Sequence, residues 1–103
     1  MYIIVFITAG SKEEAQKIAK GLLENKLAAC VNIIENIGSH FWWQGKIDNA
    51  QEALLIIKTR KTLFNKLVNK VKSLHSYDVP EIIALPIIAG NKQYLDWLSD
   101  STK

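Results

Sequence analysis

Apolar positions recur with two different periods along the chain, and these periods predict the elements of the fold. Residues 2–8, YIIVFIT, form a short run of β-branched and aromatic side chains, which is typical of a strand. The segment that follows, SKEEAQKIAKGLLEN, places an apolar residue at every third or fourth position, which predicts an amphipathic helix. Ser11 stands three residues before Glu14, the spacing of a capping box at a helix start.

The middle of the chain predicts a long hairpin and then a second helix. β-branched and aromatic residues lie on both sides of Gly45, so we expect two strands that turn near residues 44–46. Gly38 stands where the first of these strands is expected to bulge or bend. Residues 61–75 return to helical spacing, with an apolar line made of Leu63, Leu67, Val71 and Leu74.

The end of the chain predicts one more strand and a short helix. Val79-Pro80 disfavours continued helix, EIIALPII is typical of a strand, and GNKQYLDWL predicts a terminal helix capped by Asn91. The order β-α-β-β-α-β plus one helix predicts an α+β fold of the ferredoxin-like type, an antiparallel sheet with both main helices on one face. We expect a single domain over residues 1–103.

The predicted strands are apolar on both faces, whereas a sheet with one wet face alternates apolar and polar residues. Tyr2, Ile4 and Phe6 oppose Ile3, Val5 and Ile7, and the later strands repeat this pattern. Burial of six to ten such side chains would gain on the order of 10 kcal/mol after entropic costs, so we expect an oligomer packed through its sheets. The alternative is that the strand limits differ from those expected, or that the terminal helix covers this face. Pro86 predicts an edge or bulged strand.

Composition narrows the classes of function. Thirteen basic residues against ten acidic ones give a net charge of +3, and the lysines follow polar helix faces, which argues against a nucleic-acid groove. The apolar runs are shorter than the roughly 20 residues that span a membrane, so we expect a cytoplasmic protein without membrane contact. One cysteine excludes an internal disulfide, and any metal site is sparse or shared between chains.

Two residues are candidates for metal chemistry. Cys30 shares a strand face with Asn32, and a lone cysteine serves either as a small apolar residue or as a ligand. His75 ends the second long helix, where a cation also complements the helix terminus. The other interpretation is that His75 joins nearby oxygen donors in a copper or zinc site, with Tyr77, Asp78 and Glu81 as the donors.

The hairpin tip carries His40 and the aromatic block Phe41, Trp42 and Trp43. This block indicates packing against another chain, since a base-stacking platform needs more basic neighbours than Lys46 alone. No phosphate cradle, nucleophile elbow or metalloprotease helix is present, so the sequence does not indicate an enzyme.

Four segments together resemble the CutA family of divalent-cation tolerance proteins: KLAACVN, WWQGKI with EALLIIKT, HSYDVPEIIALPI and YLDWL. The resemblance implies a homotrimer of ferredoxin-like protomers that binds copper or other divalent ions in metal tolerance. The chain departs from the family by placing His75, Ser76, Tyr77 and Asp78 where His-Pro-Tyr-Glu is common. It also lacks the extra cysteines that some members carry.

The resemblance also implies where the functional residues lie. It places six residues near the clefts between subunits: Cys30, Trp43, Lys58, His75, Tyr77 and Glu81. Of these, we expect Cys30 and His75 to be the metal ligands. One alternative is a trimeric structural, signalling or partner-binding module with incidental metal binding. Another is an enzyme that uses the cleft between subunits.

Overall fold

The computed structural model describes residues 1–103 and contains the predicted elements in the predicted order. They are β1 (Tyr2–Ala9), α1 (Lys12–Glu24), β2 (Cys30–Trp43), β3 (Lys46–Arg60), a 3-10 turn (Lys61–Leu63), α2 (Phe64–Leu74), β4 (Ile82–Pro86) and α3 (Lys92–Ser101). The ferredoxin-like α+β arrangement is therefore confirmed.

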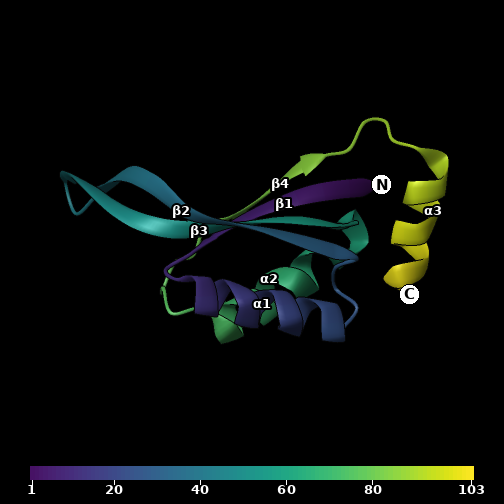
Figure 1. The fold of residues 1–103 in the computed structure, drawn as a ribbon, viewed down its shortest axis with the longest axis horizontal. Helices are drawn as coiled ribbons and strands as arrows, with labels where there is room; N and C mark the ends of the chain where they lie inside the picture. The colour runs from purple at the N-terminus through teal and green to yellow at the C-terminus, as the bar shows by residue number, and fades with distance from the viewer.

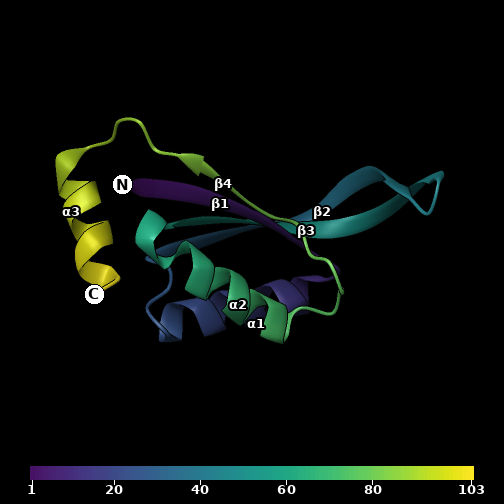
Figure 2. The ribbon, with the colours of Figure 1, turned by 180° about the vertical axis from the view of Figure 1, so that it is seen from behind.

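The four strands form one antiparallel sheet in the order β2-β3-β1-β4. Helices α1 and α2 lie side by side under one face of this sheet (Figures 1 and 2). Pro86 ends β4, which is an edge strand, and this agrees with the missing backbone donor of proline.

The predicted helix caps are present. The hydroxyl of Ser11 accepts a hydrogen bond from the backbone N–H of Glu14 at 3.1 Å, and the side chain of Asn91 accepts one from Gln93 at 2.9 Å. Each bond satisfies one of the N–H groups that a helix start leaves without an internal partner.

The core lies between the sheet and the two main helices. Alternate residues of β1 and β3 face α1 and α2, because side chains of a strand point to opposite faces in turn. The fully buried core side chains are Val5, Ile7, Ala9, Ala15, Ile18, Leu22, Leu55, Ile57, Leu67 and Val71. This arrangement leaves the other face of the sheet without a helix.

The hairpin of β2 and β3 projects beyond the rest of the molecule (Figure 1). It turns at Gln44 and Gly45, as predicted. The bulge prediction at Gly38 is wrong, because the register shifts between Ile34 and Ile37, whereas Gly38 pairs regularly with Gln51. Asn36 supplies the left-handed backbone there, with φ of 58°, and asparagine tolerates that conformation better than most residues.

The helix-free face of the sheet is apolar and partly open. Its apolar side chains are Ile4, Phe6, Ile34, Leu54, Ile56, Ile83 and Leu85, which the strand register places on one side. Ile34, Ile83 and Leu85 are 47%, 53% and 50% exposed. Helix α3 stands at the end of the sheet beside the N-terminus and does not lie over this face (Figures 1 and 2). The alternative that the terminal helix covers it is therefore wrong.

Candidate functional site

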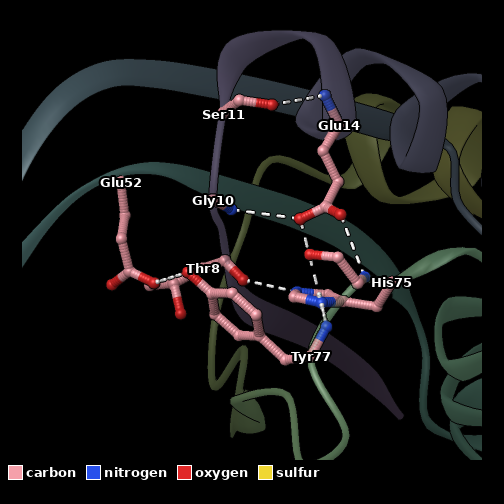
Figure 3. Close-up of polar contacts among 8 residues, drawn as sticks. Thr8, Gly10, Ser11, Glu14, Glu52, His75 and Tyr77 are labelled. Atoms are coloured by element: carbon pink, nitrogen blue, oxygen red, sulfur yellow. Dashed lines mark hydrogen bonds and ion pairs between the residues drawn. The ribbon is translucent and has the colours of Figure 1, made fainter.

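The imidazole ring of His75 is completely buried where α2 ends. Its Nε2 lies 2.8 Å from the carbonyl oxygen of Thr8, and its Nδ1 lies 3.0 Å from the backbone nitrogen of Tyr77 (Figure 3). A carbonyl only accepts and a backbone N–H only donates, so Nε2 carries the proton and Nδ1 carries the lone pair. Both ring nitrogens thus have partners within the chain.

Glu14 connects the start of α1 with the loop that follows α2. Its carboxylate accepts hydrogen bonds from the backbone N–H groups of Gly10 at 3.1 Å and Ser76 at 2.9 Å, and lies 3.8 Å from His75 Nδ1 (Figure 3). Burial raises the pKa of Glu14, but hydrogen bonds from Ser76 and Gly10 and the proximity of His75 outweigh it and lower the pKa below 4.5. The carboxylate is therefore ionised at neutral pH.

Tyr77 extends from the same loop to β3. Its hydroxyl donates a hydrogen bond of 2.8 Å to the carboxylate of Glu52, a residue that is only 8% exposed (Figure 3). Burial raises the pKa of Tyr77 to about 12, with further contributions from Glu52 and Glu14. The phenol therefore stays protonated. A Cβ atom on Gly10 would lie 3.3 Å from this hydroxyl, so glycine leaves room for the ring.

A cavity of about 550 Å³ opens between this loop and the hairpin. Trp43, Tyr77 and Glu81 contribute to its lining, together with His40 and Glu52. The fold thus brings together three of the four residues that were expected at a cleft between subunits. The fourth, Lys58, does not line this cavity.

Lys58 lies beside Cys30 on neighbouring strands, where the two residues are paired in register. The ammonium of Lys58 donates a hydrogen bond to the side-chain oxygen of Asn32, and the Cys30 thiol lies 3.9 Å from the same oxygen. Cys30 is partly buried and belongs to the helix-free side of the sheet. Burial raises the pKa of Tyr94 in α3, and the neighbouring Cys30 adds to this shift.

Cys30 and His75 do not meet within one chain. Cys30 and Lys58 are in register with Ile4 of β1, whereas His75 contacts Thr8 of the same strand. Four residues of an extended strand span about 13 Å, which is too far for two ligands of one ion. No three His, Cys, Asp or Glu side chains of the chain are close enough to hold a metal ion together. The residues of a single chain therefore do not fit a closed metal site.

Glu14 and Glu52 are the polar residues that the sequence did not single out for this site. Glu14 was expected only as part of a helix cap, yet the same carboxylate binds the backbone of Ser76, 62 residues away. Glu52 carried a usable signal: it continues the alternation of Leu54 and Ile56, which places an acid next to apolar residues on the helix-free face.

Fold and site together define a ferredoxin-like α+β protein with a buried, hydrogen-bonded histidine at the end of α2 and an open apolar sheet face. Residues 3–101 match the family model described as CutA1 divalent ion tolerance protein. The chain belongs to this family, whose name associates it with divalent-cation tolerance.

Relatives of known structure agree along their full length. The chain is 50% identical over 103 residues to the divalent-cation tolerance protein CutA of Archaeoglobus fulgidus and covers 100% of both chains. A solved structure called the periplasmic divalent cation tolerance protein CutA from the same organism superimposes with a TM-score of 0.97. The Thermus thermophilus divalent cation tolerance protein, 51% identical over 100% of both chains, gives 0.98.

Other relatives are longer and carry different locations in their names. The chain is 50% identical over 101 residues to rice Protein CutA 1, chloroplastic, covering 98% of this chain but 57% of that protein. The chain thus spans little more than half of this plant relative. No helix of the chain has both the length and the apolar character that a membrane crossing requires.

Proposed function

We propose that the protein is a homotrimer that binds divalent metal ions, copper in particular, and acts in metal-ion tolerance. Residues 1–103 act as one domain in each subunit of this assembly. The observation that carries the proposal is the half-exposed apolar face of the sheet, on which no part of the chain covers Ile34, Ile83 and Leu85 completely. Membership of a family named for divalent-ion tolerance supports the metal part.

Assembly and metal binding are linked in this proposal. One chain offers no group of three metal ligands, so a site of ordinary coordination number needs donors from more than one subunit. Cys30 lies on the face proposed to be covered in the trimer, and its thiolate suits soft Cu(I). Trp43, Tyr77 and Glu81 then lie at a cleft between subunits, and Lys58 lies beside Cys30.

His75 joins such a site only by releasing one of its two hydrogen bonds, since both ring nitrogens have partners. Metal binding at His75 therefore competes with the contacts that hold its ring between Thr8 and Tyr77.

Calorimetric titration of the intact assembly with copper tests the proposed ligands. We expect Cys30→Ser to weaken binding of Cu(I) much more than binding of Zn(II), because thiolate prefers soft ions. We expect His75→Ala to weaken binding more than His40→Ala, the matched control, which removes an exposed histidine of the hairpin. Equal affinity in the wild type and all three variants, with the assembly intact, would contradict Cys30 and His75 as ligands.

A second candidate function is a trimeric structural or partner-binding module in which metal binding is incidental. The hydrogen bonding of His75 favours it, because a histidine with two internal partners fixes a loop without any ion. Under this function, His75→Ala lowers the stability of the protein and leaves its copper affinity unchanged.

We propose the cytoplasm as the location, which suits a free, partly buried thiol such as Cys30. The names of relatives point to the periplasm and the chloroplast as well. Fractionation of cells that express the tagged protein distinguishes these compartments.

A further inference from the structure

A second cavity adjoins the one of about 550 Å³ described above and lies on the side of the hairpin. We call it the hairpin cavity; it is an open hollow of about 340 Å³, within the range of roughly 300–1,000 Å³ that small-molecule sites occupy. Three aromatic side chains contribute to its lining: Phe41 and Trp43 from β2, and Tyr77 from the loop. Phe41 and Tyr77 are each 38% exposed, so their rings are partly packed and partly open.

The polar part of the same lining is entirely acidic. Asp48, Glu52 and Asp78 contribute to it, and no lysine or arginine does. This is opposite to the charge of the chain as a whole, which is +3. The acidic character is therefore a local property of the cavity, and it favours a positively charged occupant.

Glu52 is the acidic residue of this cavity whose side chain is held in place by a hydrogen bond. The residue is only 8% exposed, and the Tyr77 hydroxyl binds one carboxylate oxygen, Oε2. The other oxygen points away from Tyr77 and has no hydrogen-bond donor in the chain (Figure 3). No fully buried polar side-chain atom lacks a partner, so this second oxygen is open to solvent. A carboxylate in a residue that is only 8% exposed keeps only part of its hydration, so it gains more from a cationic partner than a fully exposed carboxylate does.

The spacing of the acids decides what kind of cation fits. The three carboxyl groups are not close enough to hold one metal ion together, which argues against a divalent ion in this cavity. An organic cation places its charge near one carboxylate and its methyl or methylene groups against aromatic rings. Trp, Tyr and Phe rings attract such cations through their π faces, most strongly where water is excluded.

We propose that the hairpin cavity binds a small organic cation, an ammonium group carried on an apolar body. Glu52 supplies the charge contact, Trp43 and Phe41 supply the aromatic wall, and the bond from Tyr77 fixes the Glu52 carboxylate. This site is separate from the proposed copper ligands, since neither Cys30 nor His75 lines it.

Choline and 3,3-dimethyl-1-butanol are the probes that test the proposal. They have the same branched shape, but only choline carries a charge. We expect choline to bind the full-length assembly and to change its tryptophan fluorescence, and the neutral alcohol to bind at least about tenfold more weakly, or about 1.4 kcal/mol. Titration calorimetry at constant ionic strength measures both.

Two variants and two matched controls locate the site. We expect Glu52→Gln, which keeps an acceptor for Tyr77, and Trp43→Leu each to weaken choline binding about tenfold. The controls are Glu13→Gln on the exposed start of α1 and Trp97→Leu on α3, neither of which lines the cavity. Both controls keep wild-type affinity for choline. Sedimentation confirms that each variant keeps the same assembly.

Three results would overturn the proposal. Equal binding of choline and the neutral alcohol removes the role of charge. Competition by Cu(II) or Mg²⁺ that depends on Glu52 assigns the cavity to a metal ion. Absence of choline binding in a folded assembly that still binds copper shows that a neighbouring copy or side-chain movement fills the cavity, and it leaves the proposed metal function standing.

Discussion

At the scale of single residues, the loop after α2 depends on Glu14. Its carboxylate binds the N–H groups of Gly10 and Ser76 and lies beside the His75 ring, so it connects β1, α1 and the loop. The capping-box spacing predicted the Ser11 half of this arrangement. The contacts of Glu14 with Ser76 and His75 were not predictable, because they join residues far apart in the sequence, 62 positions for Ser76, that only the folded sheet brings together.

Glu14→Gln tests this role through pH. Because the folded-state pKa of Glu14 lies below 4.5, its ionisation contributes stability that is present above that value and is lost as pH falls through the folded pKa. We expect the variant to lose about 1 kcal/mol of unfolding free energy at neutral pH, less than the roughly 1.5–3 kcal/mol of bonds to a charged group, since water partly screens the carboxylate. The loss should shrink at acidic pH, as the folded carboxyl group becomes protonated.

Urea unfolding at neutral and at acidic pH measures this difference, with Glu13→Gln as a control that removes a neighbouring acid of the same helix. An equal loss at both pH values would mean that packing of the side chain, rather than its charge, accounts for its contribution.

At the scale of elements, the hairpin shows what a pattern predicts well and what it does not. Apolar and aromatic runs on both sides of Gly45 located the turn between two strands. A two-residue turn also needs residues that accept positive φ, which glycine does without strain. The bulge lay at Asn36 rather than Gly38, since asparagine also accepts the left-handed region and the register of β3 decides which residue is extra. The register between β2 and β3 cannot be predicted from the residues around the bulge alone.

Gln44→Asn should stabilise the hairpin. Gln44 and Gly45 have φ of 51° and 78°, the signature of a type I′ turn, for which Asn-Gly is the preferred pair. We expect a gain of about 0.5 kcal/mol in unfolding free energy, measured by thermal denaturation, because asparagine adopts positive φ with less strain. Gly45→Ala is the opposite control and should cost about 1 kcal/mol. A gain from Gly45→Ala would show that the turn has another conformation.

At the scale of the whole molecule, the two-sided apolar strands predicted a surface that the single chain does not cover. The structure bears out this part of the prediction, because α3 packs at the end of the sheet through Arg60 and Thr102 rather than over the open face. Periodicity finds such a face because β1, β4 and the second half of β3 are apolar at both odd and even positions. It does not give the number of subunits, which depends on shapes that one chain does not contain.

Leu85→Asp is designed to separate assembly from folding. Leu85 is 50% exposed on the helix-free face, so a carboxylate there stays hydrated in a single chain but would be buried and unpaired in a sheet-packed trimer. The matched control is Leu23→Asp, at a similarly exposed leucine, 44%, on α1. We expect sedimentation equilibrium to give three times the 11.6 kDa chain mass for the wild type and the control, and a smaller mass for Leu85→Asp with its circular dichroism unchanged. A wild-type chain that sediments as a soluble monomer, or a Leu85→Asp variant that still forms a trimer, would mean that this face is not the contact between subunits.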